Sequence, residues 1–375
     1  MIIGVPKETY LGDRRVALIP LSVERLVKKG ARVFVESGVG STIYSTDEDY
    51  KKAGAVVTNR ADVLKSADII LRVRKCPEKE VSQLKEGAIH ISFIDPFHEG
   101  YLVKELTKKK ISTISMGMIP RTTLAQKMDA LSSQANLAGY MAVILAAQRM
   151  HKILPMMISP AGTIPPARVF VVGAGVAGLQ AIATAKRLGA RVEAFDTRPV
   201  VKEEVESLGA KFVKIQIQSE QDKDGYAKAL TDEQIKQQRE GMKKVCSHSD
   251  IVITTAQLFG RKAPLIITKD MINEMKPGSV IIDMAVETGG NVEGSKLEEE
   301  IKTHNEVRIV GFGNLPSRVC AHASLMYSNN LTNLIEMFWN DEEKKFDLKT
   351  EDEIIKGCLV THNGEIVHEL LKNKG

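Results

Sequence analysis

The sequence has little cysteine, few aromatic residues and no long apolar run, and each absence excludes a class of protein. Its four cysteines, Cys76, Cys246, Cys320 and Cys358, lie far apart and match no metal-ligand spacing. This usage indicates thiols in a reduced, cytosolic setting rather than a disulfide framework or a zinc site. Aromatic residues are only 5% of the chain, and the net charge of +5 is spread among acids without a basic run. These features exclude a nucleic-acid-binding surface.

No apolar run approaches the ~20 residues that span a bilayer. The first fifteen residues lack a signal-peptide pattern, because their apolar run is short and charged residues follow at once. We therefore expect no membrane segment in this chain, so that any membrane contact comes through a partner. A length of 375 residues favours two domains, and a hydrophobic content of 43% is enough for a core in each.

The stretch 168–196 organises the chain and reads as strand, glycine turn, helix, strand. Gly173 permits a tight turn, Gly175 lets the backbone approach a pyrophosphate, and Gly178 lets the helix pack close to the strand. The free N–H groups at the start of the helix then face the phosphates. Asp196 ends the second strand about 20 residues beyond the turn, where a carboxylate accepts hydrogen bonds from the adenosine ribose. The alternative is a glycine turn used only for packing.

Two residues bear on the choice between NAD and NADP. A 2′-phosphate would lie against the Asp196 carboxylate, which favours NAD, whereas Arg198 is of the type that accepts this phosphate. We favour NAD, because the carboxylate ends the strand and the arginine does not.

Strands and helices alternate along the whole chain, which predicts an α/β fold with two Rossmann-like, doubly wound parallel sheets and a cleft between the domains. The predicted domains are an N-terminal Rossmann-like domain (1–132), an NAD-binding Rossmann domain (133–310) and a return segment (311–375) that completes the discontinuous first domain. A long helix (131–150) connects them, and a polar excursion without apolar periodicity is expected over 216–239. Strands are expected at 1–5, 32–36, 68–73, 88–93, 111–116, 168–172, 191–195, 211–215, 251–256, 280–284 and 307–310. Helices are expected at 21–29 (capped by Ser22), 49–53, 60–64, 101–108, 179–188, 271–275 and 325–339.

The polar segment 120–134 lies between the two predicted domains, where ligands often bind. Its Arg121, Gln126 and Asp129 could orient a nicotinamide ring, or the segment is a solvated loop that caps a helix. None of the eight histidines has a metal or catalytic spacing. Asp283 ends a strand, and there it either supports the site or binds local backbone amides.

At this point the residues identify a family. The chain resembles, over nearly its whole length, the NAD(H)-binding component of proton-translocating nicotinamide nucleotide transhydrogenase, the soluble first part of the alpha subunit. The matching stretches are GVPKE, RRVAL, PRTTLAQKMDALSSQANLAGY, PMMISPAGTIPPARVFVVGAGVAGLQAIATAKRLGA, VESLGAKF, GYAK, KPGSVIIDMAVETGGN and NLPSRV.

The resemblance implies a role for each matching residue. Arg121, Gln126, Asp129 and Ser132 would hold the nicotinamide end, and the first three would act in the transfer step. Gly225 and Tyr226 would belong to a mobile loop, and Gln257 would border the nicotinamide-side ribose. The residues implied for the adenosine and pyrophosphate half are Gly173, Gly175, Val176, Gly178, Asp196, Thr197 and Arg198.

The resemblance also implies a reaction and an assembly. NADH would pass hydride directly to NADP⁺ on a partner subunit, with Re/Si specificity and without an acid, a base or a metal. A separate membrane subunit would translocate protons. We expect a homodimer on the cytoplasmic face of the inner membrane, and the end of the chain shortly after Lys372 suggests that the membrane part is another polypeptide.

Two alternatives remain. The first is an amino-acid dehydrogenase like alanine dehydrogenase, which shares this two-domain plan. That family's histidine, lysine and aspartate are replaced here by Asp95, Arg74 and Glu287, while Arg15 is kept, which makes that activity less favoured. The second alternative is a non-catalytic module that senses NAD.

Overall fold

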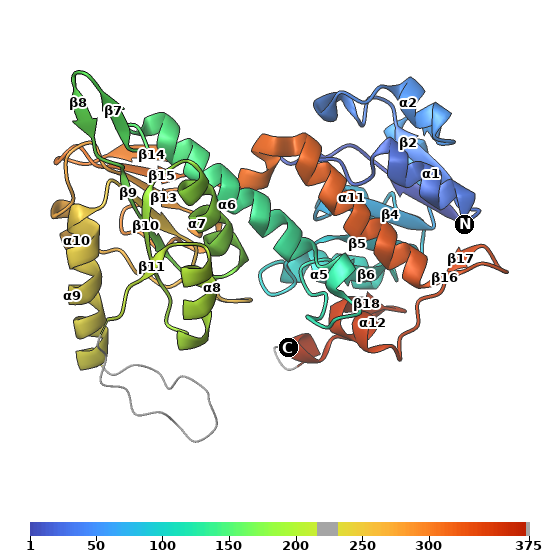
Figure 1. The fold of residues 1–375 in the computed structure, drawn as a ribbon. Helices are drawn as coiled ribbons and strands as arrows, with labels where there is room; N and C mark the ends of the chain where they lie inside the picture. The colour runs from blue at the N-terminus through green and yellow to red at the C-terminus, as the bar shows by residue number, and fades with distance from the viewer. Residues whose placement is uncertain (216–231, 373–375) are drawn as a thin grey trace. The chain divides into compact units, whose positions relative to one another are not determined.

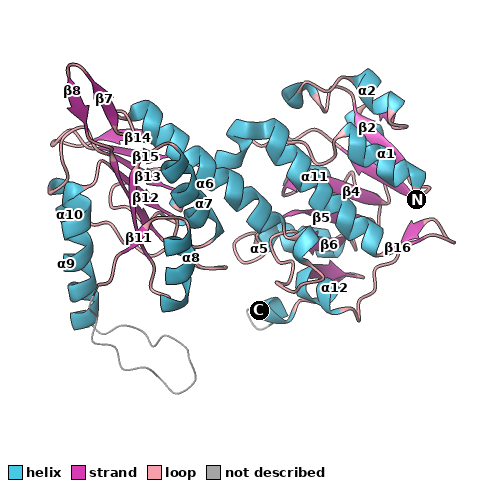
Figure 2. Ribbon diagram, viewed as in Figure 1, coloured by secondary structure: helices cyan, strands magenta, loops and turns pink. Residues whose placement is uncertain are grey.

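The computed structural model describes residues 1–215 and 232–372, which divide into two compact units. Unit 1 comprises Met1–Gln134 and Pro316–Gly375, and unit 2 comprises Ala135–Leu315. Helices and strands alternate in each unit, as Figure 2 shows, and each is built around its own large sheet. The predicted α/β class with two Rossmann-like sheets is confirmed.

Unit 1 contains an eight-stranded sheet in the order β19-β18-β6-β5-β4-β1-β2-β3. The strands from β6 to β3 pair in parallel, whereas β18, from the end of the chain, pairs antiparallel with β6. The central strands are apolar on both faces because helices cover both sides of a parallel sheet. The strands are β1 (Ile2–Val5), β2 (Arg32–Glu36), β3 (Val56–Thr58), β4 (Ile69–Arg74), β5 (Ile89–Phe93), β6 (Ser112–Ser115), β18 (Leu359–His362) and β19 (Glu365–Ile366).

The helices of unit 1 are mostly short connections between these strands, whereas α11 is long and packs much of its surface into the core. A small hairpin of β16 (Trp339–Asn340) and β17 (Lys345–Phe346) follows α11. The helices are α1 (Pro20–Lys28), α2 (Asp47–Lys52), α3 (Arg60–Ser66), α4 (Glu78–Val81), α5 (Gly100–Lys108), α11 (Cys320–Met337), α12 (Glu353–Cys358) and α13 (Glu369–Lys372).

Unit 2 contains a seven-stranded sheet in the order β11-β10-β9-β12-β13-β15-β14, parallel except for the edge strand β14. Helices α7 and α8 cover one face of this sheet, and α9 and α10 cover the other (Figure 1). The strands are β9 (Arg168–Val172), β10 (Arg191–Phe195), β11 (Lys211–Phe212), β12 (Ile251–Thr254), β13 (Val280–Asp283), β14 (Glu299–Lys302) and β15 (Arg308–Gly311). The helices are α6 (Ala130–Arg149, which begins in unit 1), α7 (Val176–Arg187), α8 (Lys202–Ser207), α9 (Asp232–His248) and α10 (Lys269–Asn273).

Several local predictions were wrong. Helix α1 begins at Pro20, the favoured residue for a first helical position, so Ser22 lies inside the helix and does not cap it. The last part of the polar excursion, 232–239, is the start of α9, whose apolar residues Met242 and Val245 pack on the sheet. The strand expected at 211–215 is limited to Lys211–Phe212. The sequence reading also missed the edge strand β14 and the hairpin of β7 (Met157–Ser159) and β8 (Gly162–Ile164).

Helix α6 meets the length and composition of a membrane span, with a hydropathy of 1.2 over its apolar window. The expectation that no apolar segment approaches that length did not anticipate this helix. Core helices of soluble proteins pass the same test, and 44% of the window is buried. Within 1–215 and 232–372 no other helix meets it.

Candidate functional site

The turn between β9 and α7 is a backbone conformation that only glycine adopts without strain. Gly173 has a φ of +96°, in the left-handed region, and its N–H donates to the Phe195 carbonyl at 2.8 Å. A Cβ at this position would lie 2.5 Å from Oγ1 of Thr255. That hydroxyl donates to the Gly173 carbonyl at 3.0 Å, so the end of β12 fixes the turn from the side.

The other two glycines of the turn have opposite surroundings. A Cβ on Gly178 would lie 1.8 Å from the Gly173 carbonyl oxygen, so only glycine lets α7 approach the turn this closely. A Cβ on Gly175 would meet no atom within 4 Å, so the space in front of this residue is open. Gly175 is the N-cap of α7 and provides no side-chain cap, and Val176 at the first helical position is 37% exposed. The N-terminus of α7 can therefore donate to an anion.

Asp196 follows β10 and is fastened to this turn. Its Oδ2 accepts the Ala174 N–H at 2.7 Å, and its Oδ1 accepts the Arg198 N–H at 2.8 Å. The Arg198 guanidinium donates to both carboxylate oxygens at 3.0 Å. Burial opposes ionisation, but the bonds from Arg198 and Ala174 hold the pKa of Asp196 below its ordinary value. The result is an ionised carboxylate beside the helix N-terminus, while Thr197 between the pair is exposed.

The strands beside β9 end at the same edge of the sheet. Gln257, just after β12, is exposed and donates to the Met284 carbonyl at 3.2 Å. Asp283, at the end of β13, is fully buried and accepts the N–H groups of Ala285 at 3.0 Å and Asn291 at 3.1 Å. Of the two roles left open for Asp283, the binding of local amides is the one observed.

The segment 120–134 of unit 1 contains a helix cap. Asp129 precedes α6 and accepts the Ser132 N–H at 2.9 Å and the Ser132 hydroxyl at 2.6 Å. Gln126 begins the short 3-10 helix η2 (Gln126–Met128), and both Gln126 and Arg121 are exposed. Asp129 and Ser132 therefore stabilise the helix start, and Arg121 and Gln126 present polar groups to solvent.

The structure thus brings together the unit 2 residues Gly173, Gly175, Val176, Gly178, Asp196, Thr197 and Arg198, with Gln257 at the same sheet edge. It brings Arg121, Gln126, Asp129 and Ser132 together in one segment of unit 1. Gly225 and Tyr226 lie outside the described residues. The sequence reading missed Thr255, although its place directly after a strand of the same sheet was a usable signal.

The positions compared with alanine dehydrogenase lie in unit 1, where both arginines bind one buried acid. Arg15 donates to Asp13 through Nε at 3.0 Å and Nη2 at 2.6 Å, and to Gln134 through Nη1 at 2.9 Å. Arg74 Nε lies 2.9 Å from the same Asp13. Burial opposes ionisation of Asp13, but the bonds from Arg15 and the charge of Arg74 lower its pKa well below the ordinary value. Asp95 is exposed and bonds to His98 at 2.7 Å.

A parallel sheet with a glycine turn, an open helix N-terminus and a carboxylate at the end of the next strand defines the Rossmann class of nucleotide-binding proteins. Family models agree: residues 4–138 match the alanine dehydrogenase/PNT N-terminal domain, and residues 142–369 match the alanine dehydrogenase/PNT C-terminal domain. The chain belongs to this alanine dehydrogenase/PNT family, as a homologue of transhydrogenase alpha subunits.

Three comparisons describe this membership. The first polypeptide of the split NAD(P) transhydrogenase alpha subunit of Rhodospirillum rubrum is 44% identical over 384 residues, covering 100% of both chains. A crystal structure of transhydrogenase from Sinorhizobium meliloti superposes with a TM-score of 0.88 at 44% identity, covering 98% of this chain and 100% of the other. An L-alanine dehydrogenase structure superposes with a TM-score of 0.82 at 23% identity, covering 100% of this chain and 98% of the other, and so shares the fold.

Proposed function

We propose that the chain is the NAD(H)-binding subunit of an NAD(P) transhydrogenase. In this proposal hydride passes between NADH on this chain and NADP⁺ on a partner subunit, and a separate membrane subunit couples the transfer to proton translocation. The geometric observation that carries it is the glycine turn, with open space at Gly175 and the Asp196 carboxylate beside it. Full-length similarity to transhydrogenase alpha subunits supports this choice within the family.

The residues of unit 2 fit the adenosine and pyrophosphate half of a dinucleotide. The N–H groups at the start of α7 would receive the pyrophosphate, for which Gly175 leaves room. Asp196 would accept the ribose hydroxyls in exchange for its bonds to the exposed Arg198 side chain, and Gln257 would border the second ribose. A negative charge at Asp196 favours a free 2′-hydroxyl over a 2′-phosphate, which supports NAD(H) as the nucleotide of this subunit.

The residues of unit 1 would orient the nicotinamide end. Bound NADH supplies the hydride, so this chain needs to position the ring rather than provide an acid or base. Arg121 and Gln126 are exposed and offer hydrogen-bond donors, and Asp129 fixes the segment by capping α6. We assign the transfer role to Arg121, Gln126 and Asp129, with Ser132 as a further ligand.

An amino-acid dehydrogenase would need an arginine for the substrate carboxylate and a proton donor. The Arg15 guanidinium is already bound by Asp13 and Gln134, and Arg74 shares the same acid. The position of that family's histidine carries the exposed Asp95. These contacts favour the transhydrogenase role over turnover of a small keto acid.

We further propose a homodimer that is cytoplasmic and reaches the inner membrane through its partner subunits. The β7–β8 hairpin supports a second copy as its occupant, because every residue of its two strands is exposed. Met157, Ile158 and Ile164 are 48%, 73% and 49% exposed, an apolar surface of the kind that self-association covers.

Reconstitution tests this function directly. The purified chain should bind NADH with little turnover of its own, and addition of the NADP(H)-binding subunit should allow reduction of an NADP analogue. Lack of transfer in the complete mixture would count against the proposal. Turnover of alanine or pyruvate by the chain alone would favour the dehydrogenase, and partner binding that depends on NADH without transfer would favour an NAD-sensing module.

Substitutions of the unit 1 segment separate transfer from binding. Arg121→Ala and Gln126→Ala should slow transfer in the reconstituted system more than they weaken NADH binding. Lys127→Ala, an exposed neighbour in η2, is the matched control and should leave both unchanged. Equal losses of transfer and binding would identify Arg121 and Gln126 as general ligands.

A further inference from the structure

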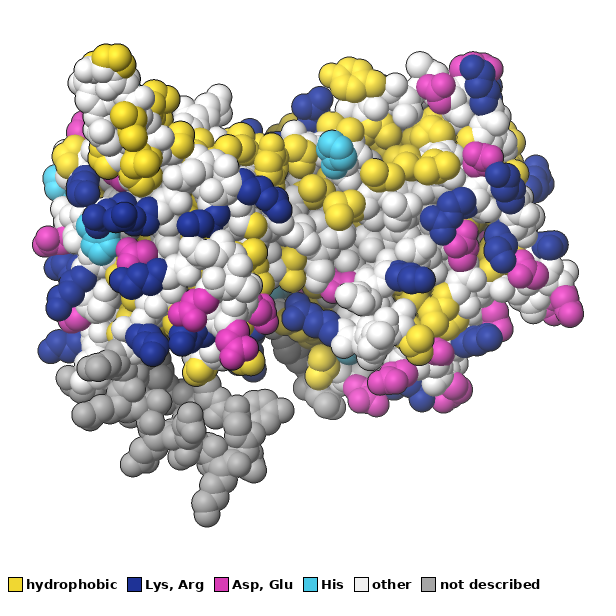
Figure 3. Space-filling model, in the orientation of Figure 1, with side chains coloured by type: hydrophobic (Ala, Val, Ile, Leu, Met, Phe, Trp, Pro, Cys, Tyr) yellow, Lys and Arg dark blue, Asp and Glu magenta, His cyan; other side chains and the backbone are white. Residues whose placement is uncertain are grey.

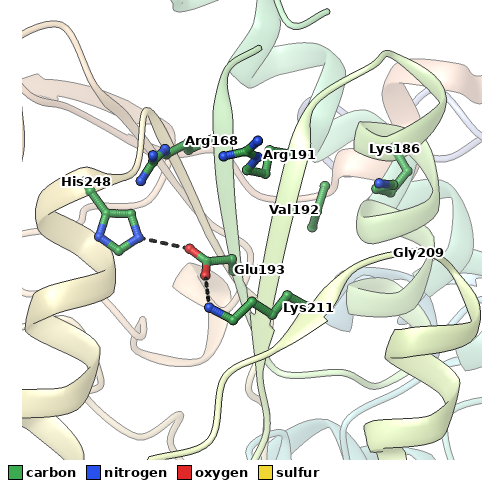
Figure 4. Close-up of a pocket in the computed structure, with 8 residues that line it drawn as sticks. All are labelled: Arg168, Lys186, Arg191, Val192, Glu193, Gly209, Lys211 and His248. Carbon is green, nitrogen blue, oxygen red and sulfur yellow. Dashed lines mark hydrogen bonds and ion pairs between the residues drawn. The ribbon is translucent and has the colours of Figure 1, made fainter. Parts of the chain in front are cut away.

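A basic hollow lies at the amino ends of the strands of unit 2, away from the glycine turn. Its volume is about 510 Å³, within the range of small-molecule sites. Lys and Arg side chains gather on this face of unit 2 in Figure 3, and Figure 4 shows the lining residues. The charged lining consists of Arg168, Lys186, Arg191, Glu193, Lys211 and His248.

The strand register places two arginines side by side. Arg191 of β10 is directly opposite Arg168 of β9, and Glu193 is directly opposite Lys211 of β11. Residues two apart on a strand share a face, so all four side chains leave the same face of the sheet. Like charges directly opposite one another are destabilising, so the arginine pair calls for an anion.

The nearby acids are already engaged. Glu193 accepts from Lys211 at 3.1 Å and lies 2.9 Å from Nε2 of His248 (Figure 4). Burial opposes ionisation, but these bonds hold the pKa of Glu193 below its ordinary value. Asp250 binds the Arg168 backbone N–H at 2.8 Å and the Lys152 ammonium at 2.6 Å.

No carboxylate within 1–215 and 232–372 therefore pairs with the guanidinium of Arg168 or Arg191, or with the ammonium of Lys186. The four lysines and arginines of the lining face the single carboxylate of Glu193, which leaves an excess of three positive charges. A dianion would balance most of this excess.

The hollow is separate from the nucleotide turn. Strand β9 runs from Arg168, at the hollow, to Val172, directly before Gly173. Four residues of strand span roughly 13 Å. A ligand at one end leaves the other end free.

We propose that this hollow is a second anion site, which binds a phosphate group. Guanidinium groups bind phosphate oxygens in bidentate fashion, and the paired Arg168 and Arg191 present two of them. Lys186, from α7 on the other face of the sheet, adds a third cation. A phosphate monoester carries about −1.5 to −2 charge at neutral pH, which matches the uncompensated charge better than a carboxylate does. The group could come from a soluble phosphate ester or a lipid headgroup.

Calorimetry with the full chain tests the site. Inorganic phosphate and pyrophosphate would be titrated at constant ionic strength with NADH already saturating, so that the nucleotide turn is occupied. Phosphatidylcholine vesicles with and without phosphatidic acid, in a flotation assay, form the lipid arm. Binding of the soluble anions identifies a soluble ester as the source, and binding only of phosphatidic acid vesicles identifies a headgroup.

Variants assign any binding to the hollow. Arg168→Gln and Arg191→Gln should each weaken phosphate binding about tenfold, the loss expected for one charged hydrogen-bonding group. Arg187→Gln removes one charge from an exposed residue that does not line the hollow and should bind like the parent. NADH affinity should stay unchanged in all three, and thermal unfolding in phosphate-free buffer verifies folding. Unaltered phosphate binding by the double variant, or no binding of phosphate, pyrophosphate or phosphatidic acid vesicles by the parent, would overturn the proposal.

Discussion

Two buried groups in unit 1 should give opposite pH dependences of stability, and replacing either one should reveal the other. The Glu8 carboxylate accepts the Val73 N–H at 2.6 Å and the Arg74 N–H at 3.3 Å. Burial raises the pKa of Glu8 from 4.5 to about 7. His90 is fully buried, and burial followed by the charge of Arg72 lowers its pKa from 6.5 to about 3.

The signs follow from proton counting. Between pH 4.5 and 7 the folded protein retains a proton on Glu8 that the unfolded chain has lost, so this group makes stability fall as pH rises. Between pH 3 and 6.5 the unfolded chain binds a proton on His90 that the folded protein does not, so this group makes stability rise. Each slope is about 1.4 kcal/mol per pH unit when one proton is fully involved. Over roughly pH 5 to 6 the two contributions cancel.

Glu8→Gln should therefore make the free energy of unfolding rise with pH, by about 1.4 kcal/mol per unit relative to the parent, over roughly pH 5 to 6. His90→Gln should change the slope by the same amount in the opposite direction. Trp339, the single tryptophan, is buried in unit 1, so its fluorescence during urea titration reports this unit. Glu24→Gln, at an exposed helix position, is the control. A Glu8→Gln slope equal to that of the parent would refute the reasoning.

Three further predictions concern unit 2. Gly178→Ala forces a Cβ against the Gly173 carbonyl and should lower thermal stability by about 1–3 kcal/mol; Gly175→Ala should keep stability but weaken NADH binding, and equal stability losses would contradict this assignment. Asp196→Ala should weaken NADH binding about tenfold or more and relax discrimination against NADPH in fluorescence titrations, with an unchanged cofactor preference as the contrary result. Ile158→Asp should shift the chain toward monomer in light scattering, whereas Leu370→Asp, at another exposed apolar position, should not; an unaltered mass for Ile158→Asp would exclude the hairpin from self-association.

Much of the fold could be predicted because local signals agreed with the tertiary structure. The strand, turn and helix around Gly173 combine apolar runs with glycine, and the expected strands match closely wherever they are buried on both faces. Strand β14 (EEIK) was missed because an edge strand need not be apolar. The β7–β8 hairpin was hidden because its prolines and exposed residues resemble a linker. The helical part of 232–239 was missed because the apolar residues of α9 come later in the helix.

The charges of unit 1 could not be predicted, because they depend on contacts between distant segments. Arg72 and Arg60 both bind Glu80, and Arg60 also binds Glu36 at 2.7 Å. Nothing in the spacing of these residues indicates that the fold brings them together. The same holds for Glu8, whose carboxylate binds the backbone of β4.

The two units use one local device with different consequences. Asp13 with Arg15 and Asp196 with Arg198 each place an arginine two residues after an acid, with the arginine N–H and both arms of its guanidinium on the carboxylate. In unit 1 the side chains are 4% and 0% exposed, and breaking such a buried pair costs about 3–5 kcal/mol. In unit 2 the arginine side chain is 56% exposed, and such a pair contributes about 0–1 kcal/mol. The Asp196 carboxylate can therefore exchange its arginine for ribose hydroxyls at little cost, whereas Arg15 stays bound to Asp13 and is not free for a substrate carboxylate. Burial, rather than sequence pattern, separates the ligand-binding acid from the structural one.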